Sequence, residues 1–543
     1  MMRNAWRLSA AALVAIVLSA ASLAQSGDIP AGEEGITRLE QQGITAPAPA
    51  PDRQNGMGPF ERLVIRGAIM IDGTGSPPVG PVDIVVEGDR ITRIVSVGAP
   101  DLPINPVVRP AAGDYEIDAS GMYIMPGFID AHAHIGSPGQ AAAGAALDPQ
   151  YVFNLWLAHG VTTVREVGSL WGLGWTMEHR DRAARGEITA PRIYAYGFFD
   201  RSISTPDEAR NWVRELARRG ADGIKFRGAA PDVAQAAMEE AAARGLETAY
   251  HHDQRTVVRN NVLHSARWGL DSMEHWYGLP EALFDDQIIQ DYPLDYNYMN
   301  EQDRFGEAGR LWQQAAPRGS DQWNLVLEEL LEHDFTLVPT MTIYEANRDV
   351  MRAREAEWHD IYTHPDLWAF LQPDPRMHGS YFFDWTTQHE IDWRENYRIW
   401  MSFLDDYKNA GGRVAVGSDS GFIYNLYGFG YIRELELLQE AGFHPLEVIQ
   451  AATFNGAELL GAEDEIGTIE VGKRADFVLV DENPIRNLRV LYGTGHPQFN
   501  WETEENERVG GVVYTIRDGI IWDARALLAE VREMVEAARQ NED

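Results

Sequence analysis

The middle of the chain alternates short apolar segments with helical ones, and this alternation constrains the fold more than any other feature. Residues 161–164 and 223–226 are short strand-like segments, whereas residues 206–219 and 231–244 have helical spacing and are each followed by a glycine. A glycine directly after the last helical residue is typical of a helix C-cap. Strand, helix and strand at this interval indicate βα units and a parallel sheet. Residues 126–465 hold enough units for an α/β fold of the closed (β/α)8 or TIM barrel type, whose reactive groups lie at the C-terminal ends of its strands.

Both flanks of this middle part are rich in β-branched segments separated by Gly, Pro and Asp turns. The segments are residues 63–67, 82–88 and 90–94 before the barrel, and 475–480, 511–515 and 519–522 after it. Such segments predict strands of a small antiparallel sheet. We therefore expect residues 60–125 and 466–523, from both ends of the chain, to build one small β-sandwich domain together.

Residues 280–400 exceed what a minimal barrel needs. They are crowded with Trp, Tyr, Asp and Glu, and residues 335–339 inside them predict one barrel strand. We interpret this segment as an insertion into the barrel units, which would build a substrate wall or a lid. A dimer contact is an equally fair role, which leaves a homo-oligomer open. Residues 524–543 predict a terminal helix without chemistry.

The N-terminus has the pattern of an export signal. Arg3 and Arg7 precede an apolar run from Leu8 to Leu23 that ends in small residues. This predicts a cleaved signal peptide over residues 1–24, since the run is short for a membrane span. Residues 25–59 are rich in Pro, Ala, Gly and Gln and predict a linker that does not pack. We expect a periplasmic or secreted protein with no membrane attachment after cleavage.

Composition narrows the classes of partner. The formal net charge of −36 disfavours nucleic acid and anionic membrane surfaces as partners, and the absence of cysteine excludes disulfide support. The chain has only three lysines, Lys225, Lys408 and Lys473. A lysine in a mechanistically sensible place is then a strong candidate, because lysine can lose its proton and arginine cannot.

His132 and His134 stand two residues apart in an apolar segment that follows a Pro-Gly turn. Side chains at i and i+2 of a strand leave the same face, so both imidazoles could share one metal ion. A chance pair of this kind is common among fifteen histidines, and the hypothesis therefore needs further ligands.

Four more polar residues follow or end predicted strands, namely Lys225, His251, His275 and Asp419. Singly, each has a plain alternative: a hydrogen-bonded histidine, or an aspartate that caps a helix. Together with the first pair they form an ordered series on barrel strand ends. Histidine nitrogen and aspartate oxygen suit zinc and similar divalent ions. A buried, deprotonated lysine can add carbon dioxide, and the carbamate offers two oxygens that bridge a metal pair.

Several stretches resemble the strand signatures of the amidohydrolase superfamily, most of all its imidazolonepropionase-like and prolidase-like branch. They are Phe-Ile-Asp-Ala-His-Ala-His at 128–134, Gly-Ala-Asp-Gly-Ile-Lys at 220–225, Met-Glu-His at 273–275, Gly-Ser-Asp-Ser at 417–420, and the tail at 451–461 and 466–476. The resemblance covers nearly everything after the linker.

The resemblance implies two divalent metal ions, expected to be zinc, with carbamylated Lys225 as the bridge between them. It implies that His132, His134 and Asp419 hold one ion, and that His251 and His275 hold the other. A metal-bridging hydroxide would attack an amide-type carbonyl, whose oxygen the second ion polarises. Asp419 would take the proton from the water and deliver it to the leaving nitrogen, so that Asp419, His275 and Lys225 count as the catalytic residues.

Two details of the substrate pocket depart from the pattern or stay open. The fifth-strand motif has adjacent histidines, so we expect His251 at the ligand position and His252 facing away or towards the substrate. Arg227, two residues past Lys225, could bind a substrate carboxylate through its planar fork or form a salt bridge on the barrel rim.

These expectations amount to a hydrolase that cleaves an amide-type C–N bond in a small molecule: a peptide, an N-acyl amino acid or a cyclic amide. An ester, lactone or carbamate hydrolase at the same metals is the first alternative, because the attack is identical. A non-catalytic binding protein would need an eroded metal set. A glycosidase would use paired carboxylates and would need neither the histidines nor the lysine.

Overall fold

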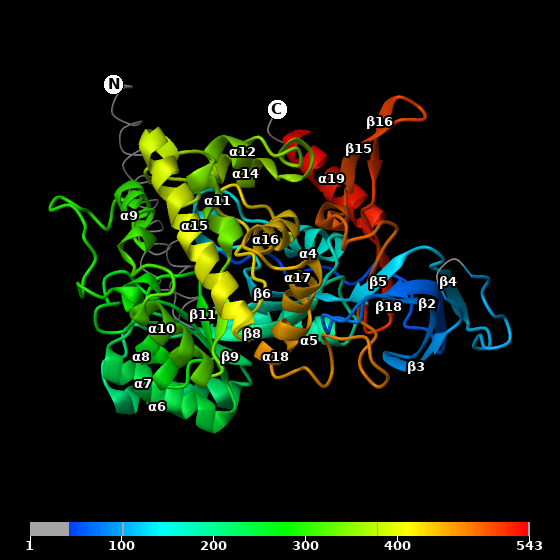
Figure 1. Ribbon diagram of the computed structural model, residues 1–543, viewed down its shortest axis with the longest axis horizontal. Helices are drawn as coiled ribbons and strands as arrows, with labels where there is room; N and C mark the ends of the chain where they lie inside the picture. The colour runs from blue at the N-terminus through cyan, green and yellow to red at the C-terminus, as the bar shows by residue number, and fades with distance from the viewer. Residues whose placement is uncertain (1–42, 100–101, 377, 541–543) are drawn as a thin grey trace, which may run out of the picture.

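The computed structural model describes residues 43–99, 102–376 and 378–540. Its central part is a barrel of eight parallel strands in sequential order (Figure 1). The strands are β6 (Phe128–Ala133), β7 (Val161–Glu166), β8 (Arg192–Phe198), β9 (Gly223–Arg227), β10 (Glu247–His251), β11 (Ser272–Glu274), β12 (Thr336–Val338) and β13 (Arg413–Val414).

The first and the last strand meet through backbone hydrogen bonds that lie just beyond β13. The amide of Ala131 donates to the carbonyl of Val416 at 2.8 Å, and the amide of Asp419 donates to the carbonyl of His132 at 2.8 Å. These bonds close the ring, and they fix the loop after β13 against the strand that carries the first histidine. The expected barrel is thus confirmed.

Helices cover the outside of the barrel between successive strands. They are α4 (Pro149–Ala158), α5 (Leu173–Ala184), α6 (Pro206–Arg219), α7 (Pro231–Arg244), α8 (Val262–Arg267), α10 (Asp321–Glu332), α15 (Thr387–Asn409), α16 (Phe429–Glu440), α17 (Pro445–Ala452) and α18 (Phe454–Leu459). Both α6 and α7 begin and end where the sequence predicts. Gly220 and Gly245 follow them with φ of 85° and 68°, the left-handed conformation that favours glycine.

The strands from both chain ends form one mixed sheet of eight strands at the right of Figure 1. They are β1 (Leu63–Met70), β2 (Val79–Glu87), β3 (Arg90–Ser96), β4 (Tyr115–Asp118), β5 (Tyr123–Pro126), β14 (Phe477–Val480), β17 (Val512–Arg517) and β18 (Ile520–Asp523). The extra sheet domain built from both ends is confirmed. Its strands hydrogen-bond into a single sheet rather than two, because β14 pairs with β5 and β5 pairs with β1.

A buried ion cluster joins this sheet domain to the barrel. Arg192 at the start of β8 contacts Asp476 at 2.6 Å and Asp518 at 2.5 Å, both from the C-terminal part of the sheet domain. Burial acts to lower the pKa of Arg192, but the two carboxylates raise it overall. The cluster is therefore charged and fully paired, and removing one partner would leave an uncompensated buried charge.

Two excursions from the barrel make up the crowded segment. After β11 the chain forms η1 (Pro280–Leu283), α9 (Glu301–Ala308) and η2 (Trp312–Gln314) before α10. After β12 it forms α11 (Met341–Arg348), α12 (Val350–Arg354), α13 (His359–Tyr362), α14 (Pro365–Phe370) and η3 (Phe382–Asp384) before α15. The strand expected at residues 335–339 is β12. Large aromatic side chains of this segment, among them Trp312, Trp393 and Trp400, are fully buried, so it forms part of the core.

The segment before β1 differs from the sequence expectation. Residues 1–24, the expected signal peptide, and the first part of the linker lie outside the described residues. The described part, from residue 43, was expected not to pack, and this is wrong: Ile44 and Ala50 are buried. The Trp175 indole donates to the carbonyl of Pro47 at 3.2 Å, and the amide of Ala50 donates to His179 at 3.1 Å. A proline-rich chain still offers carbonyl acceptors, which the barrel surface uses.

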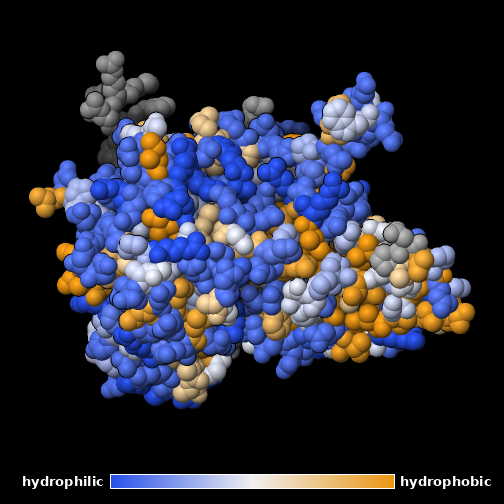
Figure 2. All heavy atoms as spheres, in the orientation of Figure 1, coloured by the Kyte–Doolittle hydropathy of each residue, from blue (hydrophilic) through white to orange (hydrophobic). Residues whose placement is uncertain are grey.

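The C-terminal elements are the ribbon β15 (His496–Asn500) and β16 (Glu505–Val509), which projects from the body in Figure 1, and the predicted terminal helix, α19 (Ala524–Gln540). Figure 2 shows apolar residues gathered over the sheet domain; its exposed apolar side chains include Val79, Leu102 and Val107. Across the described ranges, no helix combines the length and the apolar character that a membrane span requires.

Candidate metal centre

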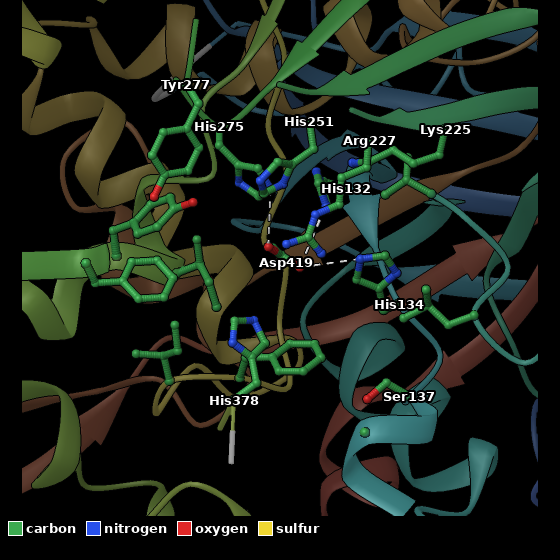
Figure 3. Close-up of a pocket in the computed structure, with 18 of the residues that line it drawn as sticks. His132, His134, Ser137, Lys225, Arg227, His251, His275, Tyr277, His378 and Asp419 are labelled. Atoms are coloured by element: carbon green, nitrogen blue, oxygen red, sulfur yellow. Dashed lines mark ion pairs between the residues drawn. The ribbon is translucent and has the colours of Figure 1, made fainter. Parts of the chain in front are cut away.

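The first barrel strand delivers two histidines to one point. His132 is in β6 and His134 follows directly after it, with ring centroids 5.3 Å apart. The Nε2 atoms of His132 and His134 lie 3.6 Å and 3.5 Å from Oδ1 of Asp419, which follows β13 (Figure 3). Two ligand atoms that share a tetrahedral zinc ion are roughly 3.4 Å apart, given bonds of about 2.0–2.2 Å. Each of the two histidines is therefore at a distance from Asp419 that a shared ion allows, although the group whose ligand atoms all lie within 4.8 Å of one another contains His275 and not His134.

His275 completes the group from the opposite side of Asp419. Its Nε2 lies 3.7 Å from Oδ2 of Asp419, and the ligand atoms of His132, His275 and Asp419 all lie within 4.8 Å of one another. Both His275 and Asp419 have positive φ, 63° and 49°. Non-glycine residues adopt this conformation at a cost of about 1–3 kcal/mol, and such strain concentrates at functional sites.

Lys225 lies within β9, and His251 is the last residue of the neighbouring strand β10. The His251 ring centroid is 4.5 Å from that of His275. The Lys225 side chain is only 4 % exposed, and among the described residues its Nζ has no hydrogen-bond partner. Burial lowers the pKa of Lys225 to about 8, although Glu274 and Asp419 act in the opposite direction. An orphaned buried amine of this kind fits a lysine whose functional form is a carbamate.

The electrostatics of the cluster favour a cation. Burial holds the pKa of His132, His251 and His275 well below their ordinary value, so these imidazoles are neutral and their lone pairs are free to bind. At His134 burial acts to lower the pKa, but Glu166 and Asp419 raise it overall. The carboxylates around the His134 ring therefore favour a positive charge there, whether proton or metal ion.

Further polar residues hold the imidazoles in place. Glu274 lies 2.5 Å from Nδ1 of His132, Glu166 lies 3.1 Å from Nδ1 of His134, and Thr340 lies 2.6 Å from Nδ1 of His275. With Nδ1 engaged in each ring, Nε2 is left for the centre. Sequence reasoning missed these residues. The signal for Glu166 was a charged residue at the end of a barrel strand; nothing local marks Thr340.

Two buried charged residues connect the strands beneath the centre. Arg165 contacts Glu274 at 2.6 Å and donates to Ser272 at 2.9 Å. Asp130 accepts hydrogen bonds from the amide of Ser418 at 2.9 Å and from its hydroxyl at 2.6 Å. Burial raises the pKa of Asp130 to about 7. Asp130 thus fixes the turn that presents Asp419, next to the strand that presents the histidine pair.

The six candidate residues line one cavity of about 140 Å³. Its outer wall comes from the excursions and the loop after β13, and it includes Tyr277, Tyr298, Arg304, Phe305, Ile343, Tyr344, His378, Phe422 and Ile423. Arg227 lines the cavity as well. His252 does not: its ring stacks on Tyr250 at 4.2 Å, and its Nε2 lies 2.8 Å from the Ser265 hydroxyl. Of the two adjacent histidines the structure brings His251 to the centre, and we assign His252 no substrate contact.

Comparison with curated proteins gives short matches. The chain is 29% identical over 164 residues to the 5'-deoxyadenosine deaminase of Methanobrevibacter smithii, which covers 26% of this chain and 37% of that protein. It is 30% identical over 206 residues to the allantoinase of Rubrobacter xylanophilus, covering 32% of this chain and 41% of that protein. The chain therefore matches less than half the length of these curated relatives.

Comparison with solved structures covers far more of the chain. A Xaa-Pro dipeptidase with bound methionine shares 19% identity at a TM-score of 0.54, over 85% of this chain and 100% of that one. A bottromycin amidohydrolase shares 18% identity at a TM-score of 0.59, over 94% of this chain and 95% of that one. At these identities the likeness supports the fold alone. The model of the amidohydrolase family matches residues 123–290 and 400–521, which is more than half of the chain and leaves out most of the two excursions. The protein therefore belongs to the amidohydrolase family.

Proposed function

We propose that the protein is a metal-dependent hydrolase that cleaves an amide-type C–N bond, in a peptide, an N-acyl amino acid or a cyclic amide. The observation that carries the proposal is that four histidines, one aspartate and one lysine line a single cavity. Among the described residues the amine of this lysine has no hydrogen-bond partner. A glycosidase would need none of these imidazoles, and a binding protein would not need all six side chains.

In the proposed site His132, His134 and Asp419 hold one divalent ion, and His251 and His275 hold a second. Lys225, as a carbamate, would supply further oxygen ligands, and zinc is the ion that the donor set favours. Bound ions of this kind supply a water of lowered pKa and polarise the carbonyl oxygen. Asp419 accepts the proton of the attacking water, for which the buried carboxylate is suited because burial raises its pKa.

The cavity wall supports a substrate that carries a carboxylate. Arg227 lines the cavity, and no hydrogen bond or ion pair of its guanidinium occurs among the described residues. Aromatic side chains such as Tyr277 and Phe305 supply apolar surface beside it. A planar guanidinium binds a carboxylate through two parallel hydrogen bonds, so N-acyl amino acids and peptides with a free C-terminus fit this wall.

Arg227→Gln tests the carboxylate contact. We expect KM for an N-acyl amino acid to rise roughly 10- to 100-fold, because a hydrogen bond to a charged group contributes about 1.5–3 kcal/mol. The change should be much smaller for the substrate whose carboxylate is replaced by a neutral amide. Arg218→Gln, on the exposed surface of α6, is the matched control. Equal effects on both substrates would remove Arg227 from the substrate site.

The activity itself is tested with zinc-loaded protein against N-acyl amino acids, dipeptides, cyclic amides and matched esters. We expect about two ions per chain by elemental analysis and loss of turnover on chelation. Lys225→Ala should lose bound metal together with the rate. Turnover that survives chelation, or a Lys225→Ala protein with full metal content and rate, would contradict the proposal. Hydrolysis of esters or lactones without any amide would favour the alternative substrate class.

We also propose that the protein acts outside the cytoplasm, on the basis of the basic and apolar pattern of its first residues. N-terminal sequencing of the protein recovered from its native compartment should begin near Gln25. A cytoplasmic protein that retains Met1 would contradict export.

A further inference from the structure

Two excursions from the barrel meet over the cavity and place a histidine against a glutamate there. Helix α9 carries Glu301, and the loop between α14 and η3 carries His378. The Nδ1 atom of His378 lies 2.8 Å and 2.9 Å from the two carboxylate oxygens of Glu301. The pair joins residues 77 positions apart, and it is separate from the six side chains of the metal centre.

The position of Glu301 is determined by further contacts. Its side chain is only 5 % exposed, and Arg304, one turn along α9, contacts it at 3.1 Å. Burial acts to raise the pKa of Glu301, but His378 and Arg304 lower it overall. Glu301 is therefore an ionised carboxylate that holds a proton on Nδ1 of the imidazole.

With Nδ1 engaged, the atom of His378 left for other partners is Nε2. The imidazole lines the same cavity as Asp419. Its ring centroid lies 6.3 Å from that of Phe305 and 5.7 Å from that of Phe422. Figure 3 shows it pointing from its loop towards the side of the cavity where Asp419 lies. Apart from other histidines, the charged side chains that line this cavity with His378 are Lys225, Arg227, Arg304 and Asp419, and Glu301 contacts the imidazole directly.

We propose that His378 is the proton donor to the leaving nitrogen, and that Glu301 is its positioning residue. The inference rests on the proposed amide hydrolysis. An imidazole whose Nδ1–H is held by a carboxylate can carry a second proton on Nε2 and aim it into the cavity. His378 and Glu301 therefore belong to the two excursions, whereas Asp419, which accepts the proton of the attacking water, belongs to the barrel.

The step balances as follows for an amide. The C–N bond of the tetrahedral adduct breaks, its electron pair stays on nitrogen, and that nitrogen takes the proton from Nε2 of His378. The imidazole is left neutral with its Nδ1–H on Glu301. The proton that Asp419 accepted from the water then returns to His378 through water in the cavity, so one water is consumed and no net proton.

The leaving group decides how much the donor matters. An amine must be protonated to depart, whereas p-nitrophenolate departs readily without a proton. The test therefore compares one acyl group as its amide with an amino acid and as its p-nitrophenyl ester, both with zinc-loaded protein. For His378→Gln we expect kcat/KM on the amide to fall roughly 100-fold or more, and kcat/KM on the ester to fall by less than about three-fold.

Glu301→Gln should reduce the amide reaction in the same direction but by a smaller factor, since it removes the charge and keeps a hydrogen-bond acceptor. His333→Gln, on the exposed end of α10, is the matched control and should change neither rate. Ester turnover by each variant reports that the fold and the metal centre are intact.

A second measurement follows the pair without turnover. Isotope-labelled histidine should give a downfield Nδ1–H resonance that disappears in both His378→Gln and Glu301→Gln. Equal losses on the amide and the ester, or a resonance that persists in Glu301→Gln, would overturn the donor role while leaving the proposed hydrolysis in place. A wild-type protein that cleaves only the ester would instead refute the proposed amide hydrolysis.

Discussion

The buried Lys225 lowers the free energy of unfolding of the metal-free protein, and the substitution Lys225→Met tests this. The substitution replaces an ammonium group that has no hydrogen-bond partner among the described residues with an apolar side chain of similar length. We expect the chelated variant to be more stable than the chelated wild type, and at the same time to bind less metal and to lose activity.

The magnitude follows from the pKa. Burial lowers the pKa of Lys225 from 10.5 to about 8, which corresponds to roughly 3 kcal/mol against the charged form. Below pH 8 the lysine is protonated in both the folded and the unfolded chain, so the full cost is present at pH 7. Between pH 8 and 10.5 the folded chain releases its proton first, and the cost declines. The advantage of Lys225→Met should therefore be about 3 kcal/mol at pH 7 and shrink towards pH 10.5.

The assay is urea and thermal unfolding in the presence of a chelator at pH 7, 9 and 10.5, with elemental analysis of the metal-loaded proteins. Lys408→Met is the control, because it removes a lysine that pairs with Glu447 at 2.9 Å and should not stabilise the chain. A variant no more stable than the wild type at pH 7, or a difference that does not change with pH, would refute the reasoning.

The remaining predictions concern the support of the centre. Glu166→Ala removes the 3.1 Å contact to Nδ1 of His134 and should lower metal affinity roughly 10- to 100-fold by calorimetry, whereas Glu178→Ala on the exposed face of α5 should not. Gly417→Ala would place a Cβ 2.6 Å from a methyl carbon of Val338, so we expect a loss of about 1–3 kcal/mol in the free energy of unfolding; an unchanged unfolding midpoint would show that the strand pair can shift.

The fold and the position of the centre could be inferred from local patterns. Two helices with their glycine caps and the strand-ending polar residues are visible in the sequence because helix capping and strand period are short-range effects. Once the strands are parallel, their C-terminal ends meet at one mouth of the barrel. Lys225, His251 and Asp419 come together for that reason, although about 190 positions separate Lys225 from the strand that presents Asp419.

The support and the wall of the site could not be inferred in this way. Glu274 lies 142 positions from His132, and Thr340 lies 65 positions from His275, so no periodicity marks either contact. The pair of Glu301 and His378 depends on how two irregular excursions fold against each other. The packing of the segment after residue 43 could not be inferred for a related reason. A proline-rich composition indicates that a segment does not form regular strands or helices, but it does not show whether neighbouring side chains donate hydrogen bonds to its carbonyl groups.

The chain has a net charge of −36, which would be expected to repel a substrate that carries a carboxylate before it reaches Arg227 in the cavity. At physiological ionic strength the Debye length is about 8 Å, so charges on the outer surface are largely screened beyond that distance. Inside the cavity the dielectric is lower and the screening weaker, and the field there is set by groups a few ångströms away. Arg227 lines this space without an ion-pair partner among the described residues, whereas the charge of Arg304 is balanced by Glu301. The guanidinium of Arg227, which has no close ion pair among the described residues, therefore acts on a substrate carboxylate at shorter range than the surface charge does, and the acidic exterior does not exclude an acidic substrate.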